Sequence, residues 1–268
     1  MPKISNQIID EAKYYSCGYC VNHMKFIVKR PQEKKRNFPA GVFLLHHAKY
    51  GYILFDTGYS LRNYECGWKG FLYNLLNPLY VKKEETIVEQ LKKDGIKASD
   101  IRYIILSHMH PDHIGGLKDF PKSKIICSRD CYRQYQKKNI KDLIFLNLLP
   151  SDFTHRVYRV KTYNYMTPFF EGFDLFKDGS VILTDISGHA KGQLGAYIKE
   201  HSIFLGADAA WGLSLLDKVD EMSPFARLVQ NNFKEYRKGM SLLKKLKKER
   251  VTVYLSHDDC YKKDLLNE

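Results

Sequence analysis

Four potential metal ligands stand close together at residues 107–113, where the chain reads Ser-His-Met-His-Pro-Asp-His. The imidazoles of His108, His110 and His113 and the carboxylate of Asp112 suit zinc and similar divalent ions. A strand-like apolar run at residues 101–106 ends just before them, so the turn that leaves it can direct alternate side chains at adjacent ions. So many polar groups beside a buried strand would be costly without compensation. The motif therefore predicts a metal site.

Three further polar residues follow strand-like runs later in the chain. His189 lies in Ser-Gly-His-Ala-Lys-Gly-Gln, Asp208 in Phe-Leu-Gly-Ala-Asp, and His257 in Tyr-Leu-Ser-His-Asp. Any one of them could be an ordinary turn or strand-end residue, because such residues are common there. Residues that close strands can, however, reach the same edge of a sheet. Together the two sets would provide seven ligands.

The elements that must position these residues are a mixture of strands and helices. Helical spacing of apolar residues predicts helices at residues 84–93 and 233–248. Between Asn63 and Val81 lies an aromatic stretch without a clear strand or helix pattern, which we interpret either as a lid or as a loop packed by its own aromatic side chains. The fold class is therefore α/β. Apolar runs rich in branched residues predict strands at 41–46, 52–55, 101–106, 124–127, 180–184, 195–198, 202–205 and 251–255.

Length and composition favour a single soluble domain. Of the 268 residues, 44% are hydrophobic and 27% charged, which is enough to bury a core and excludes intrinsic disorder. No repeat or Pro-rich linker divides the chain. No apolar run approaches the roughly 18 residues of a membrane span. Residues 1–6 are followed by acidic and polar residues, so we expect no signal peptide. We therefore expect no membrane partner and a cytoplasmic location.

The charge and the cysteines narrow the possibilities further. A formal net charge of +13 favours anionic partners without naming one, and the dispersed lysine clusters resemble a solvated face more than a nucleic-acid stripe. The six cysteines are too few and too irregular for a secreted disulfide framework. We interpret Cys17-Gly-Tyr-Cys20 as structural, because no second such pair stands at zinc-finger spacing.

The order of the motifs resembles that of the metallo-β-lactamase superfamily of metal-dependent hydrolases. The likeness runs over residues 38–258 and includes HxHxDH and the later Gly-His, Gly-Ala-Asp and Ser-His, preceded by Phe55-Asp-Thr-Gly. It implies a four-layer αβ/βα sandwich of two mixed β-sheets, with one hydrolase domain at residues 1–268 and the site at the sheet edges. It also implies that Asp56 orients the HxHxDH loop.

The resemblance also assigns the ligands to two divalent metal ions, with zinc favoured and iron or manganese as alternatives. A metal-bound hydroxide would then attack a carbonyl or phosphoryl group, with Asp112 and Asp208 as catalytic groups that relay the proton. A binding protein without catalysis is disfavoured, because all seven ligands are present. The implied sets are His108, His110 and His189 for one ion and Asp112, His113 and His257 for the other, with Asp208 bridging them.

Within the superfamily, the motif order most resembles the N-acyl homoserine lactonases, which predicts a small-molecule carboxylic ester or lactone as substrate. The β-lactamases resemble one another in a cysteine where Asp208 stands, so antibiotic hydrolysis is disfavoured. A thioesterase of glyoxalase II type would need a C-terminal helical region, and little chain follows His257. A phosphodiesterase or ribonuclease of the same fold is a further alternative, because it shares HxHxDH and suits the positive charge.

One position departs from the lactonase pattern. These lactonases commonly have a tyrosine three residues after the bridging aspartate, whereas this chain has Trp211. Indole donates one hydrogen bond but no proton near neutrality, so ring opening needs a direct test. With Trp68 and Phe71 of the aromatic stretch, Trp211 is a candidate for an apolar substrate pocket. The sequence does not indicate an oligomeric state.

Overall fold

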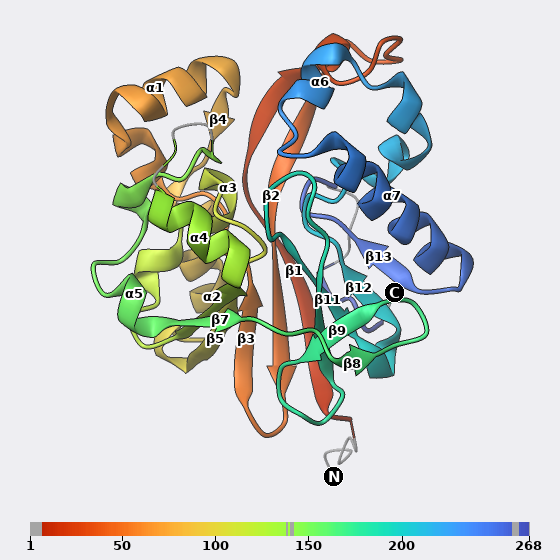
Figure 1. Cartoon of the computed structure of the whole chain (residues 1–268). Helices are drawn as coiled ribbons and strands as arrows, with labels where there is room; N and C mark the ends of the chain where they lie inside the picture. Colours follow the sequence, from red (N-terminus) through yellow and green to blue (C-terminus); the bar gives the residue numbers. More distant parts are fainter. Residues whose placement is uncertain (1–6, 138, 140–141, 259–262, 268) are drawn as a thin grey trace.

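The computed structural model describes residues 7–137, 139, 142–258 and 263–267. Two β-sheets pack face to face, and helices cover their outer faces (Figure 1). Both sheets contain parallel and antiparallel pairs, so the predicted α/β sandwich of two mixed sheets is confirmed. Residues 1–6, from which no leader was inferred, and Cys260 lie outside the described residues.

The first sheet has the strand order β4-β1-β2-β3-β5-β6-β7. The pairs β1–β2 and β2–β3 are antiparallel, whereas β3, β5, β6 and β7 run parallel to one another. The strands are β1 (Ile9–His23), β2 (Lys35–His47), β3 (Gly51–Phe55), β4 (Leu79–Tyr80), β5 (Ile101–Ile105), β6 (Lys124–Ser128) and β7 (Val157–Val160).

The second sheet has the order β13-β12-β11-β10-β9-β8. All of its pairs are antiparallel except β12–β13, which is parallel. The strands are β8 (Tyr165–Met166), β9 (Glu171–Asp174), β10 (Val181–Asp185), β11 (Leu194–Ile198), β12 (Ile203–Leu205) and β13 (Thr252–Tyr254).

The helices divide between the two outer faces, with α1 to α5 beside the first sheet and α6 and α7 beside the second (Figure 1). A further 3₁₀ segment, Leu213–Glu221, precedes α6. The helices are α1 (Gly67–Leu76), α2 (Ile87–Lys93), α3 (Pro111–Ile114), α4 (Arg129–Lys137), α5 (Phe153–Arg156), α6 (Pro224–Leu228) and α7 (Phe233–Lys248).

The core follows from the alternation of side chains along the strands. In β3, Ile53 and Phe55 point into the cluster between the sheets, whereas Leu54 packs against the outer helices. In β10, Leu183 lies between the sheets and Ile182 faces the cluster that contains α7. Strands that are apolar on both faces read as continuous hydrophobic runs, which explains why these strands could be predicted.

Two segments differ from the sequence-based expectations. No strand was predicted at Ile9–His23, although β1 pairs with β2 along most of its length. A register shift between Ser16 and Tyr19, where Gly18 has φ 78°, breaks the alternation expected of a strand. The stretch between Asn63 and Val81 showed no clear strand or helix pattern in the sequence, yet it contains helix α1 and overlaps the 3₁₀ segment Leu61–Glu65.

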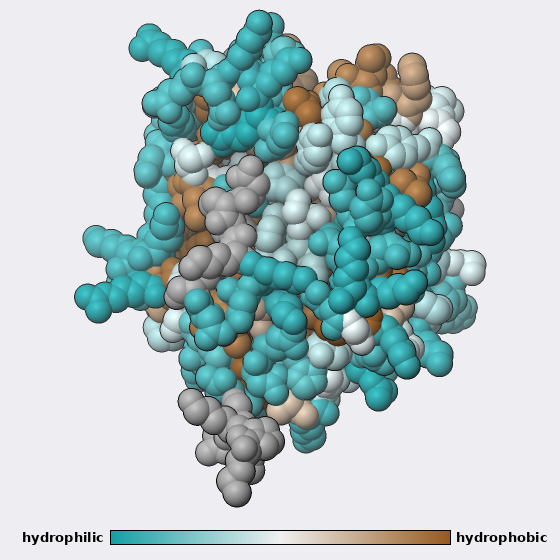
Figure 2. Space-filling model, turned by 180° about the vertical axis from the view of Figure 1, so that it is seen from behind, coloured by the Kyte–Doolittle hydropathy of each residue, from teal (hydrophilic) through white to brown (hydrophobic). Residues whose placement is uncertain are grey.

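Helix α1 was missed although the apolar spacing of a helix is present in its sequence. Trp68, Phe71, Leu72, Leu75 and Leu76 follow the spacing of one helix face, but all of them are exposed. Viewed from behind, hydrophobic side chains gather at the upper right of the molecule, where α1 lies (Figure 2). Of the two interpretations of this stretch, a loop packed on the core by its own aromatic side chains does not fit most of the helix, and the lid stays a prediction.

The strand directions place several loops at one edge of the sandwich. Strands β3 and β5 are parallel, and β10, β12 and β13 share one direction in the second sheet. Their carboxyl ends lead into the loops that contain the predicted ligands. Among the described residues, no helix is long and apolar enough to cross a membrane.

The loop after β10 depends on a close approach to α7. Gly188 has φ 149°, and a Cβ atom there would lie 2.3 Å from the backbone nitrogen of Tyr236. We expect Gly188→Ala to lower the free energy of unfolding by about 1–3 kcal/mol more than Gly95→Ala, measured by urea titration. Gly95 is the matched control, because it also has a positive φ of 79° but nothing within 4 Å of its added Cβ. Equal losses in the two variants would contradict this packing.

Candidate metal centre

All seven predicted ligands lie together at this edge of the sandwich. They form two groups, and within each group one candidate ligand atom per residue lies within 4.8 Å of the others. Six of the seven are buried. The first group comprises His108, His110 and His189, and the second comprises Asp112, His113, Asp208 and His257.

The first group brings three imidazoles together from two sheets. His108 and His110 follow β5, and His189 follows β10. His110 Nδ1 lies 3.0 Å from His108 Nε2 and 3.0 Å from His189 Nε2. Pro111 stands at the first position of α3, directly after His110. The helix therefore begins there and carries the next two ligands, Asp112 and His113.

Asp208 connects the two groups. Its Oδ2 lies 2.9 Å from His257 Nε2 and 3.3 Å from His189 Nε2, and its Oδ1 lies 3.3 Å from His113 Nε2. Asp112 Oδ2 is 3.5 Å from His113 Nε2 and 3.6 Å from His257 Nε2. One carboxylate therefore faces both groups, whereas the other faces the second group alone.

Asp56 forms hydrogen bonds with residues at both ends of the Ser107–His113 motif. Its carboxylate accepts hydrogen bonds from the Ser107 backbone N–H at 2.8 Å, the Ser107 hydroxyl at 2.7 Å and His113 Nδ1 at 2.7 Å. Asp56 is fully buried, and its backbone φ is 66°, which is uncommon for a residue other than glycine. The geometry places Asp56 where it can orient the loop, as the resemblance implied.

Hydrogen bonding leaves too few protons in the first group. Ser107 Oγ, whose own proton goes to a carboxylate, accepts from His108 Nδ1 at 3.0 Å, which leaves His108 Nε2 with a lone pair. Gln230 Oε1 accepts from His189 Nδ1 at 3.0 Å with the same result. His110 Nδ1 can carry only one proton, yet it faces both bare nitrogens. A shared cation fits this arrangement.

The second group sets imidazoles beside carboxylates, and two of its atoms are left unsatisfied. His113 Nδ1 donates to Asp56, and His257 Nδ1 donates to the Pro39 carbonyl at 2.7 Å, so that both Nε2 atoms point inward. Among the described residues, His113 Nε2 and Asp208 Oδ1 are buried without a hydrogen-bond partner. Buried acceptors that converge without donors are costly, and a divalent cation would satisfy them.

The electrostatics of the two groups differ. Burial, followed by the charge of His189, lowers the pKa of His110 to about 3, and burial also lowers the pKa of His108 and His189. Burial opposes charge on His257 as well, but Asp208 outweighs it and raises the pKa of His257 to about 9. Burial likewise opposes charge on His113, but the carboxylates beside it outweigh this and raise its pKa. The imidazole pKa values therefore shift upward in the second group and downward in the first, whose neutral rings can bind metal directly.

The proposed substrate-pocket residues are not all brought to this centre. Trp211 lies beside it, with its ring centroid 5.6 Å from that of His189 in an edge-to-face arrangement. Trp68 and Phe71 lie on α1 with exposures of 67% and 73%, and no contact of either with the seven ligands is seen in the described part of the chain. Trp211 is therefore the pocket candidate that the geometry supports most directly.

Several residues of the site carried no signal in the sequence. Gln230 fixes the ring of His189 from 41 positions away, and its own amide is oriented by a 2.8 Å bond to the Ala226 carbonyl. The hydroxyls of Tyr59 and Tyr73 lie 3.0 Å apart, and burial, followed by neighbouring charges that include Asp112, raises the pKa of both. Only the periodicity of α1 could have pointed to Tyr73.

The cysteine pair belongs to neither ligand group, although Cys20 lies near enough for the charges of Asp112 and Asp208 to add to the raised pKa that its burial causes. Cys17 and Cys20 are buried in β1 as free thiols, and neither belongs to the metal-binding groups found among the described residues. Cys17 packs in the cluster beneath α2, and Cys20 packs with Phe38. This position agrees with the structural interpretation of the pair.

Comparisons of sequence agree with this geometry. A family model described as the metallo-beta-lactamase superfamily matches residues 42–257. An N-acyl homoserine lactonase of Bacillus thuringiensis is 29% identical over 238 residues, which cover 84% of this chain and 83% of that protein. A probable metallo-hydrolase of Mycobacterium tuberculosis is 36% identical over 76 residues, 28% of this chain. The chain spans only 24% of the length of this mycobacterial relative.

Solved structures share the fold at low identity. A quorum-quenching N-acyl homoserine lactone lactonase superposes with a TM-score of 0.70 at 24% identity, over 94% of this chain and 93% of that one. A probable metal-dependent hydrolase from Staphylococcus aureus gives a TM-score of 0.73 at 14% identity, over 95% and 91% of the two chains. Because the family model matches most of its length, this chain belongs to the metallo-beta-lactamase superfamily.

Proposed function

We propose that this protein hydrolyses a small carboxylic ester or lactone with two divalent metal ions, within a single domain. The observation that carries the proposal is the convergence of bare imidazole nitrogens and carboxylates at one edge of the sandwich. The similarity to the Bacillus thuringiensis lactonase over most of both chains supports the ester or lactone class. Zinc suits this mixed donor set best, with iron or manganese as alternatives.

The two groups are proposed to hold one ion each. Asp208 is the shared ligand, because its Oδ2 lies near both His189 and His257. Both of its oxygens face imidazoles, so its main role is to keep the two cations together. The remaining ligands are His108, His110 and His189 for one ion and Asp112, His113 and His257 for the other.

Bound divalent ions would lower the pKa of a water molecule toward neutrality and polarise a carbonyl oxygen. The residues of the chain then hold and move protons. Asp112 is better placed than Asp208 to move protons. Imidazoles face one oxygen of Asp112, Oδ2, whereas they face both oxygens of Asp208. We propose that the Asp112 carboxylate accepts the proton of the attacking water and returns it to the departing alkoxide.

Trp211 supplies an apolar surface beside the ligands. Trp211 lies over His189 and packs in two hydrophobic clusters, so it can form a wall for an acyl group. Its indole N–H can donate a single hydrogen bond but cannot supply a proton to an alkoxide. Proton return must therefore come from another group, which agrees with the role assigned to Asp112.

The first test is metal content. We expect protein purified without chelator to contain close to two equivalents of zinc, iron or manganese by elemental analysis, because the donors form two groups. One equivalent or less after reconstitution would contradict the dinuclear assignment.

Two variants at this site distinguish a metal ligand from a residue that lines the proposed substrate pocket. Asp208→Ala should lose metal and most activity, because it leaves two cations close together with less negative charge between them. Trp211→Ala should keep its metal and change substrate affinity. Full metal content and activity in Asp208→Ala would exclude the bridging role.

A further prediction concerns Asp56, which is not a proposed metal ligand but forms a hydrogen bond with His113. Asp56→Asn places an amide N–H against either the Ser107 or the His113 donor, so one hydrogen bond is lost whichever way it turns. We expect metal affinity to fall about 10–100-fold in chelator competition. Asp217→Asn is the matched control, because Asp217 is an exposed carboxylate whose one ion pair within the described part of the chain is with Lys244. Equal affinity in the two variants would show that Asp56 does not position His113.

The third test separates substrate classes. We expect hydrolysis of an acyl homoserine lactone or a simple ester, with little dependence on salt, because an apolar acyl group is recognised by burial. The alternatives are a ribonuclease or phosphodiesterase of the same fold and a thioesterase of glyoxalase II type. Cleavage of structured RNA that collapses at raised salt, with no lactone opening, would support the nuclease instead. Preferential thioester hydrolysis would support the thioesterase.

A further inference from the structure

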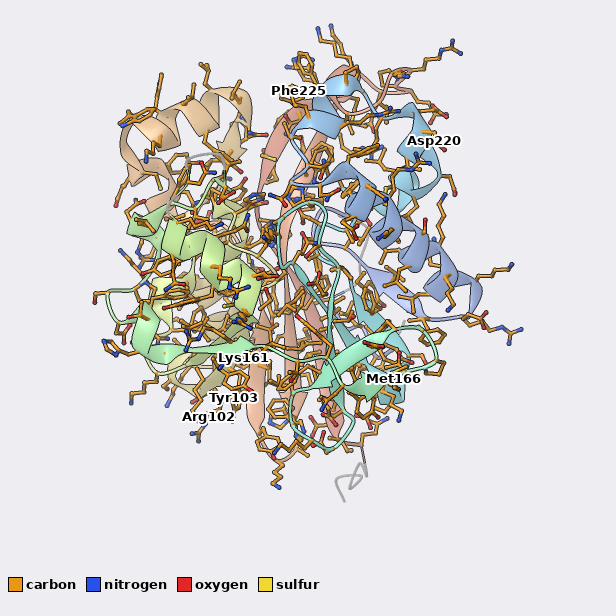
Figure 3. The ribbon with its side chains drawn as sticks, in the orientation of Figure 1. Arg102, Tyr103, Lys161, Met166, Asp220 and Phe225 are labelled. Carbon is orange, nitrogen blue, oxygen red and sulfur yellow. The ribbon has the colours of Figure 1, made fainter. Side chains whose placement is uncertain are left out.

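A basic cavity lies outside the metal centre, between α4 and the end of β7. Its volume is about 330 Å³, within the range of small-molecule sites. Figure 3 labels Lys161, which lies where the chain leaves β7. None of the cavity residues belongs to the two ligand groups. The lining residues are Arg129, Tyr132, Arg133, Gln136, Arg159 and Lys161.

Positive charge dominates this cavity. Four of its six lining residues are cationic. Arg133 pairs with the exposed carboxylate of Asp130 at 2.9 Å, which offsets one of the four positive charges. Among the described residues, Arg129, Arg159 and Lys161 form no ion pair with a carboxylate. Like charges that share a concave surface repel one another, and a bound anion would relieve that repulsion.

The cavity is built on a rigid floor. Tyr132 is buried and stacks on Phe153 with ring centroids 6.4 Å apart. The guanidinium of Arg159 lies 4.9 Å from the centroid of the Tyr132 ring, a cation–π contact that holds it in place. Cations held in position lose less conformational entropy when a ligand binds.

The cavity is tied to the sheet edge that carries the metal centre. Strand β6 lies between β5 and β7, and all three end at the same edge because they are parallel. Ser128 Oγ, at the end of β6, accepts from the Cys131 N–H at 3.0 Å and donates to the Gly192 carbonyl at 2.6 Å. The start of α4 is thereby fixed to the loop that contains His189.

We propose that this cavity binds a small, multiply charged phosphate anion, either free diphosphate or the diphosphate part of a larger small molecule. Guanidinium groups match pairs of phosphate oxygens in a bidentate fork, and a lysine adds a point charge. The cations are gathered in one concave site instead of along an extended groove, which favours a small anion over a nucleic acid.

Binding of inorganic pyrophosphate and of ADP to the metal-loaded protein tests the proposal by titration calorimetry and thermal unfolding. We expect saturable binding, and a rise in Tm of about 2–5 °C at a tenfold excess over Kd. The double variant Arg129→Gln/Lys161→Gln should weaken binding at least about tenfold, because it removes two charge-assisted contacts. Pyrophosphate binding alone would indicate a free anion, whereas tighter ADP binding would indicate a diphosphate carried by a larger molecule.

Controls separate the cavity from the metal centre. Lys92→Gln removes an exposed cation elsewhere and should bind pyrophosphate as the wild type does. Without the anion, the double variant should be at least as stable as the wild type, because it relieves repulsion between like charges. Pyrophosphate binding that survives in the double variant would place the anion at the metal centre and overturn the proposal. No saturable binding, or binding of an RNA oligonucleotide alone, would also overturn it.

Discussion

The structure depends on a buried cluster of imidazole and carboxylate groups that has too few hydrogen-bond donors to satisfy all of its atoms. Imidazole nitrogens and carboxylate oxygens from distant parts of the chain converge at one edge of the sandwich. In the protein alone, His113 Nε2 and Asp208 Oδ1 are left without hydrogen bonds among the described residues. Such an arrangement destabilises the fold unless cations satisfy it, so the metal requirement is part of the stability of this edge as well as of its chemistry.

The fold meets this constraint by fixing each ring from outside. His108, His113, His189 and His257 each donate an outer Nδ1 hydrogen bond, to a serine, an aspartate, a glutamine and a backbone carbonyl respectively. These bonds set the tautomer and leave Nε2 free to face the centre. The partners come from separate elements, so the precision of the site is distributed over both sheets. A change in the packing of one element therefore reaches the ligands through these outer bonds.

The ligands could be predicted from the sequence because they are local or follow recognisable strands. The HxHxDH motif places four ligands within six residues, and the runs before Asp208 and His257 are apolar on both faces. Gln230 could not be predicted, because it touches His189 only through the fold. Helix α1 could have been predicted from its periodic apolar residues, but not the exposure of its apolar face, because such a pattern is usually interpreted as a buried face.

The net charge of +13 does not by itself indicate what the metal centre binds. The buried part of that centre has two carboxylates facing histidines, and its neighbour Trp211 is apolar. The cations of the basic cavity lie instead around α4 and β7, on the far side of β6 from β5. Because exposed charges act over about 8 Å at physiological ionic strength, a cluster attracts anions chiefly to its own surroundings. The positive charge and an uncharged ester substrate are therefore compatible, since they concern different parts of the sandwich edge.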